Sequence, residues 1–91
     1  MKISELLTDE TKWCKMACAK DKDGNLVNEL SDTAVKWSLH GAIWKCHSDN
    51  NMMKVIIKIH DYMGEKYLWQ WNDAPERTFE DVRKLIEELN I

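Results

Sequence analysis

The sequence is poor in proline, glycine and cysteine, and it contains no long apolar run. It holds one proline, three glycines and three cysteines in 91 residues. An odd number of cysteines does not suit the disulfide framework of a small secreted domain, so we expect reduced thiols at Cys14, Cys18 and Cys46. No segment approaches the roughly 20 apolar residues of a membrane span, and none near the N-terminus resembles a signal peptide. We therefore expect a cytoplasmic protein without membrane contact.

The sequence also has no excess of positive charge. Thirteen Lys and Arg residues stand against 16 Asp and Glu residues, which gives a net charge of −3. Proteins that bind the nucleic-acid backbone need a clustered basic face, so we expect no direct nucleic-acid partner. The acidic excess is concentrated in residues 64–91, which hold seven acidic and four basic residues.

The usual motifs of an enzyme or a metal site are not found. The glycines stand seventeen or more positions apart, which excludes a Gly-rich phosphate loop. Cys46 and His47 would point about 100° apart on a helix, so they do not form a nucleophile and its base. The segment Asp21–Asp32 resembles a calcium loop, but Leu26 occupies the position that requires glycine. We expect no catalytic residue, no metal and no cofactor.

Tryptophan is the residue present in unusual amount, with five copies in this short chain. Each buried indole covers roughly 150–250 Å². A chain of this length can therefore build one core without disulfides or metals, and we expect residues 1–91 to form a single globular domain.

Apolar spacing and turn signals predict a mainly α (α+β) fold with about four helices around a Trp-rich core. The Asp23-Gly24 pair predicts the turn of a small β-hairpin within residues 16–28. Ser31-Asp32, Ser48-Asp49 and Thr78 are the predicted caps of the three longer helices. Residues 67–71 alternate like a short extended segment. The helices are expected at residues 2–7, 32–46, 50–63 and 79–89.

The helix predicted for residues 32–46 has two apolar sides. One side carries Leu39, Ala42 and Ile43. The other carries Trp37, Gly41 and Trp44 at positions i, i+4 and i+7. A single core of 91 residues has difficulty covering both sides, so one hypothesis is a homo-oligomer with this second stripe as its interface.

The segment from Trp69 to Val82 has a structural and a functional interpretation. In the structural one, Trp69 and Trp71 share a face in the core, and Arg77 pairs with Asp73 or Glu76. In the functional one, the polar residues of this loop recognise a small polar ligand or a side chain of a partner beside an aromatic wall. The residues that would do so are Asn72, Asp73 and Arg77.

Two sequence patterns resemble a known family. They are Ala34-Val-x-Trp37-Ser-x-x-Gly41-Ala42 and Trp71-Asn-Asp-x-Pro-x-Arg77-Thr78. Together with the order of the elements, they are similar to a domain of unknown function found in actinobacteria and in bacteriophage genomes. The resemblance spans nearly the whole chain. It supports a fold, and it implies no activity because none is established for the family.

We therefore expect a small non-catalytic protein-interaction module encoded by a phage or a mobile element. A finer hypothesis is an inhibitor of a host defence system, like an anti-CRISPR protein, whose carboxylates take the place of phosphates. Its binding surface would combine the wall around Trp71 with the acidic residues Glu80, Glu87 and Glu88. The alternative is a small-ligand binder or an enzyme that uses Asn72, Asp73 and Arg77.

Overall fold

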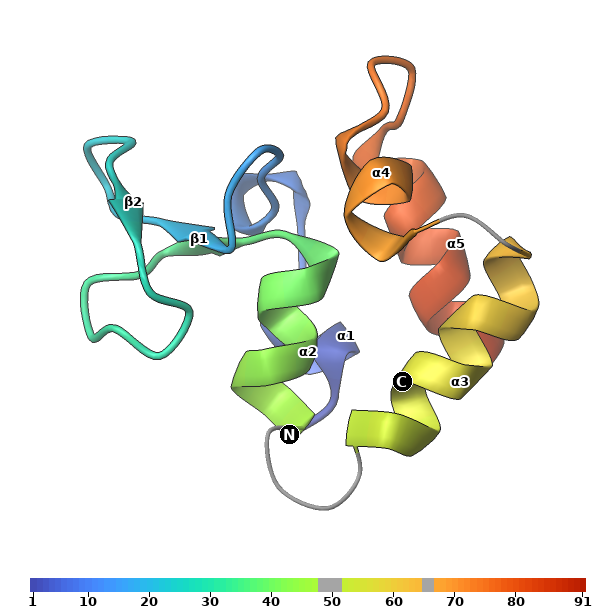
Figure 1. Cartoon of the computed structure of the whole chain (residues 1–91). Coiled ribbons are helices and arrows are strands. Elements are labelled where there is room, and N and C mark those ends of the chain that lie inside the picture. The colour runs from blue at the N-terminus through green and yellow to red at the C-terminus, as the bar shows by residue number, and fades with distance from the viewer. Residues whose placement is uncertain (48–51, 65–66) are drawn as a thin grey trace.

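The computed structural model describes residues 1–47, 52–64 and 67–91. In this part of the chain, helices surround one core and a small three-stranded antiparallel sheet lies at one end (Figure 1). The mainly α, α+β class predicted from the sequence is confirmed. The elements are α1 (Ile3–Leu6), η1 (Glu10–Lys12), β1 (Ala19–Lys20), β2 (Leu26–Val27), β3 (Lys36–Trp37), α2 (Leu39–His47), α3 (Met52–Met63), α4 (Leu68–Asp73) and α5 (Phe79–Leu89).

The predicted hairpin is present. Strands β1 and β2 pair antiparallel, with Ala19 opposite Val27. Gly24 adopts φ +84°, which a residue without a Cβ accepts at no steric cost. The Asp21 carboxylate closes the loop by accepting hydrogen bonds from the Asp23 and Asn25 amides at 2.9 Å each.

The predicted start of the second helix is wrong. Ser31 and Asp32 lie in a turn, and the chain then forms β3, which pairs antiparallel with β1 on the side away from β2. Ser38 begins helix α2 instead, because its hydroxyl accepts a hydrogen bond from the Gly41 amide at 3.0 Å. Both Ser31 and Ser38 are suitable caps. Because residues 36–37 pair with β1 as a strand, the helix can begin only after them, at Ser38.

The proposed stripe of Trp37, Gly41 and Trp44 is therefore not one face of a helix. Trp37 lies in β3, is 8% exposed, and donates its indole N–H to the Glu29 carbonyl at 3.0 Å. Gly41 is buried against the backbone of Cys18. Only Trp44 is exposed. Two of the three residues are used inside the chain, which removes the geometry on which the oligomer hypothesis was based.

The helix predicted for residues 79–89 is confirmed as α5. Thr78 and Asp81 form a capping box at its start, in which each side chain accepts a hydrogen bond from the other residue's backbone amide. Val82, Leu85 and Ile86 are buried along one face. Helix α3 ends at Gly64 (φ +80°), as expected. Its predicted cap, Ser48-Asp49, lies outside the described residues.

The extended segment predicted for residues 67–71 is wrong, because residues 68–71 lie in helix α4 and Tyr67 precedes its first turn. The Trp71 amide donates to the Tyr67 carbonyl at 3.0 Å, which closes one helical turn. Trp69 and Trp71 consequently do not share a face: Trp71 is buried and Trp69 is exposed. Alternation over five residues also matches a single helical turn, so the pattern alone could not separate the two structures.

The core lies where α2 meets its neighbours. Helix α2 contacts α1, α3, α4 and β3, and α5 packs against α1 and α3. The fully buried apolar side chains come from α1, α2, α3 and α5 and include Ile3, Leu39, Ile43, Ile59 and Leu85. Within the described ranges, no helix has both the length and the apolar character needed to cross a membrane.

Replacing Gly41 by Ala should destabilise the fold strongly. A Cβ at this position would lie 1.9 Å from the Cys18 carbonyl oxygen, so α2 must move away from β1. We expect a loss of roughly 3 kcal/mol or more in the free energy of unfolding, measured by urea denaturation. The control is Gly64→Ala, where only the backbone conformation is strained and roughly 1–2 kcal/mol should be lost. An equal loss in both variants would contradict the close approach of α2 to β1.

Candidate functional site

The side chain of Asn72, near the end of helix α4, is buried and only 1% exposed. Its amide oxygen accepts hydrogen bonds from the Trp13 indole N–H at 2.8 Å and from the Leu39 amide at 3.0 Å. Its amide nitrogen donates to the Cys14 carbonyl at 3.2 Å and to Asp73 Oδ1 at 2.9 Å. Both donors and both acceptor positions are used, so Asn72 joins three segments of the fold.

We call the hydrogen bonds around Asn72 the Asn72 junction. Asp73, Ala74 and Pro75 continue it with hydrogen bonds to Lys15 and Met16. Asp73 Oδ1 also accepts a hydrogen bond from the Met16 amide at 2.9 Å. Met16 has φ +63°, an uncommon conformation for a residue with a side chain. The Lys15 ammonium donates to the carbonyl oxygen of Ala74 at 2.7 Å. The end of α4 therefore determines the path of the chain between η1 and β1.

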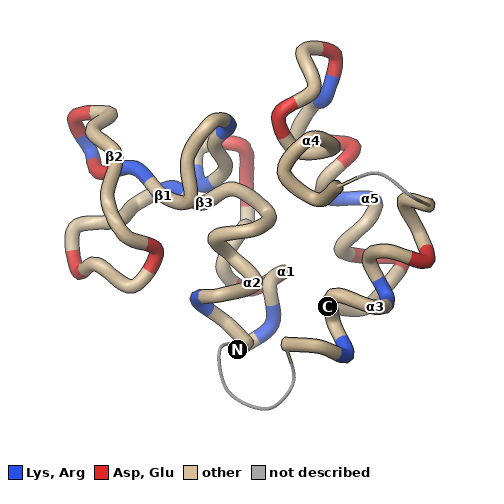
Figure 2. The backbone as a smooth tube through the Cα atoms, viewed as in Figure 1, with Lys and Arg blue, Asp and Glu red and all other residues tan. Residues whose placement is uncertain are grey.

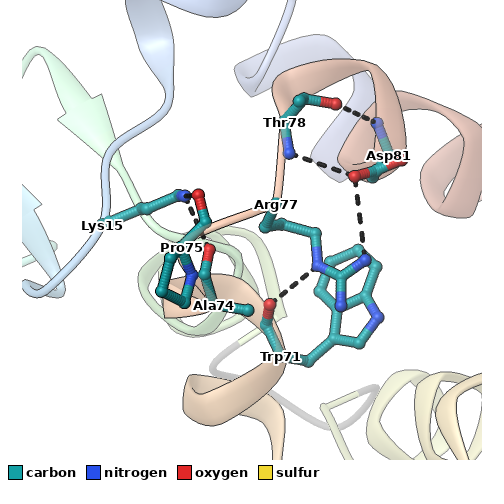
Figure 3. A network of polar contacts seen from close by, with 7 residues as sticks. All are labelled: Lys15, Trp71, Ala74, Pro75, Arg77, Thr78 and Asp81. Atoms are coloured by element: carbon teal, nitrogen blue, oxygen red, sulfur yellow. Dashed lines mark hydrogen bonds and ion pairs between the residues drawn. The ribbon is translucent and has the colours of Figure 1, made fainter.

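Arg77 is held by three contacts within the chain (Figure 3). Its Nε donates to the Trp71 carbonyl at 2.8 Å, and its guanidinium carbon lies 3.9 Å from the centre of the Trp71 ring. Its Nη1 lies 3.7 Å from Asp81 Oδ2. The predicted pairing with Asp73 or Glu76 is wrong, because the turn between α4 and α5 brings Asp81 to the guanidinium instead.

The polar side chains of Asn72 and Arg77 thus mainly contact other residues of the chain. Asn72 and Arg77 make the contacts described above and do not project together toward solvent. Trp71 is buried beneath the guanidinium of Arg77. Asp73 differs from these residues, because one of its oxygens is used internally while the residue also borders a cleft.

A cleft of about 220 Å³ separates the start of α2 from α4 and the segment before β1. Trp69 borders it with 58% of its surface exposed, and His40 borders it from α2. Sequence reasoning did not identify this cleft, because an outward-facing Trp69 follows only from the helical conformation of α4. The lining residues are Ala17, Cys18, Ser38, His40, Trp69, Asn72 and Asp73. A larger but more open depression of about 430 Å³ lies beside η1.

The reactive side chains of the cleft are not arranged for catalysis. Burial raises the pKa of the Cys18 thiol, and the nearby Glu29 raises it further, so the thiol stays protonated at neutral pH. His40 Nε2 accepts a hydrogen bond from the Trp44 indole N–H at 3.1 Å, which commits that nitrogen to the indole. The described residues contain no group of three His, Cys, Asp or Glu side chains placed to hold a metal ion. A protonated Cys18 thiol is a weak nucleophile, and the Nε2 of His40 is occupied by the indole, so these two groups are not arranged for group transfer.

The predicted acidic surface on α5 is partly neutralised. Acidic and basic residues are interspersed along this helix (Figure 2). Arg83 forms ion pairs with both Glu80 and Glu87, the latter at 2.7 Å. The hydrogen bond from Arg83 lowers the pKa of the Glu80 carboxyl. Two of the three predicted acidic residues, Glu80 and Glu87, therefore share one cation. The third, Glu88, is exposed.

The chain belongs to the family of unknown function DUF6197, whose model matches residues 2–89. The expected membership of an uncharacterised family is therefore confirmed. No significant match is found among curated proteins or among solved structures. The family supplies no activity, so the function has to be argued from the geometry of the site.

Asn72→Ala should be one of the most destabilising substitutions in the chain. It leaves the Trp13 indole, the Leu39 amide and the Cys14 carbonyl without their partner, and each orphaned group costs roughly 1–3 kcal/mol. We expect a loss of roughly 3–5 kcal/mol in unfolding free energy by urea denaturation. Gln70→Ala, on the exposed side of α4, is the control and should stay within about 0.5 kcal/mol of wild type. A loss below about 1 kcal/mol for Asn72→Ala would show that the junction is not needed.

The capping box should make stability sensitive to acid. The hydrogen bond from the Thr78 amide lowers the pKa of the Asp81 carboxyl below its ordinary value of 3.8, with a further contribution from Arg77. Because the pKa is lower in the folded state, the stabilisation is complete above 3.8 and is lost as pH falls through the folded-state pKa. Melting temperatures measured from about pH 6 to pH 2 should fall less steeply for Asp81→Asn than for wild type. Asp61→Asn, on the exposed surface of α3, is the control. Parallel curves for wild type and Asp81→Asn would contradict the role of the carboxylate.

Proposed function

We propose that the chain is a small non-catalytic protein-interaction module that binds its partner at the cleft between α2 and α4. The observation that carries this proposal is Trp69, a large aromatic side chain left 58% exposed beside a cleft. Tryptophan is among the residues that contribute most to binding at interfaces. Met16, whose amide binds Asp73, adds an apolar side chain that is 73% exposed.

Rigidity supports the same assignment. The floor of the cleft includes Ser38 and Asn72, which are both buried and hydrogen-bonded to the start of α2. A surface whose support is already in place loses little conformational entropy on binding. The protonated Cys18 thiol and the committed His40 nitrogen argue against a catalytic use of the same cleft.

A finer proposal concerns the origin and the target of the module. The family resemblance and the net charge of −3 support a protein of a phage or mobile element that inhibits a host defence system, as anti-CRISPR proteins do. Because Arg83 pairs with Glu80 and Glu87, the face of α5 presents less free negative charge than its composition suggests. We therefore propose that the main contact lies at the cleft. The acidic face of α5 would mainly increase the rate at which a basic partner associates.

Selection of random peptides displayed on phage against the immobilised protein tests the proposal. Peptides that bind wild type should lose affinity for Trp69→Ala by on the order of tenfold or more, because the exposed indole is removed while the core is left intact. Ile57→Ala is the matched control, since Ile57 is an equally exposed apolar residue on α3. Peptides that bind Trp69→Ala as tightly as wild type, or a selection that yields none, would contradict a protein-binding cleft.

A further inference from the structure

The size of the cleft suits a single side chain. Pockets that bind drug-sized ligands and cofactors measure roughly 300–1,000 Å³. The cleft between α2 and α4 measures about 220 Å³. It is therefore too small for a cofactor, but it exceeds by several times the roughly 30 Å³ that a water molecule occupies in the liquid.

The cleft is mainly apolar, and two of the groups that border it favour a cation. Trp69 supplies an exposed indole, whose face attracts positive charge. Asp73 supplies a carboxylate: its Oδ1 accepts two hydrogen bonds, from the Met16 amide and the Asn72 side chain, and none of the described residues donates to its Oδ2. Lysine and arginine are absent from the described lining. Lys15, which precedes Met16, donates to the carbonyl oxygens of Ala74 and Pro75.

The same combination already holds a cation within this chain. The Arg77 guanidinium stacks on the Trp71 ring at 3.9 Å and lies 3.7 Å from the Asp81 carboxylate. An indole and a carboxylate thus bind one guanidinium on the buried side of α4. Trp69 and Asp73 offer the same two groups at the cleft, and no cation among the described residues pairs with either of them.

We propose that the cleft binds an arginine side chain of the partner protein, with its guanidinium stacked on Trp69 and hydrogen-bonded to Asp73 Oδ2. Arginine suits this site better than lysine, because the planar guanidinium stacks on aromatic faces and directs several N–H donors in one plane. The inference rests on the proposed function, and it specifies which partner surface the module recognises. A basic partner surface also agrees with the net charge of −3.

Titration of the full chain with N-acetyl-arginine amide, followed by NMR at the Trp69 indole N–H, tests the assignment. We expect dissociation constants in the millimolar range, as for a single contact, and binding weaker by about tenfold for N-acetyl-citrulline amide, which has nearly the same shape without the charge. Asp73→Asn should cause a similar loss while it keeps an oxygen acceptor for the Met16 amide. Asp61→Asn, an exposed acidic residue on α3 outside the cleft, is the matched control and should bind like wild type.

Each other result overturns the assignment. Equal binding of the citrulline compound would show that charge is not recognised, and equal binding of N-acetyl-lysine amide with a free ε-amine would remove the preference for arginine. If Asp73→Asn does not fold, Trp69→Ala replaces it, with the Asp73 backbone amide as the NMR probe, and unchanged binding to that variant would exclude the stacking contact. The peptide selection separates the two levels: selected peptides that depend on Trp69 but lack arginine would leave the proposed function standing and contradict only the arginine. The absence of any peptide that depends on Trp69 would contradict both.

Discussion

The buried amide of Asn72 is the interaction on which the rest of this structure depends. One side chain with two donors and two acceptor positions joins the Trp13 indole, the carbonyl of Cys14 and the first amide of α2. A buried amide without partners would cost several kcal/mol, so it specifies these three neighbours and not others. Helix α4 is short and irregularly flanked, and this junction fixes its position against the sheet and α2.

The position of α4 determines which of its side chains are buried and which are exposed. The side chains directed inward, Trp71 and Asn72, hold the fold, and Arg77 closes over Trp71 from the following turn. Trp69 of the same helix is left exposed, and it borders the cleft together with Asp73. The inward-facing side chains of this segment are thus structural, while the binding surface that we propose uses the exposed Trp69 and the Asp73 oxygen that no described residue binds.

Local signals in the sequence predicted local structure well. The glycine at position 24 marked the hairpin, and Thr78 marked the start of α5, because both signals act within four residues. The start of α2 was misplaced because Ser31 and Ser38 are both good caps, and only pairing of β3 with β1, eighteen residues away, selects the second. The cleft could not be predicted at all, since the exposure of Trp69 depends on α4 being helical and on its docking through Asn72.

Hydrogen exchange of the Trp13 indole N–H and the Leu39 amide measures the central claim most directly. The Leu39 amide belongs to the first turn of α2, where amides have no partner inside the helix and normally exchange fast. If Asn72 holds both groups, they should exchange as slowly as the amide of Leu85 in the core of α5, because all three open only when the chain unfolds. Exchange of either group at the rate of a frayed terminus would show that the Asn72 junction opens independently and does not hold the fold together.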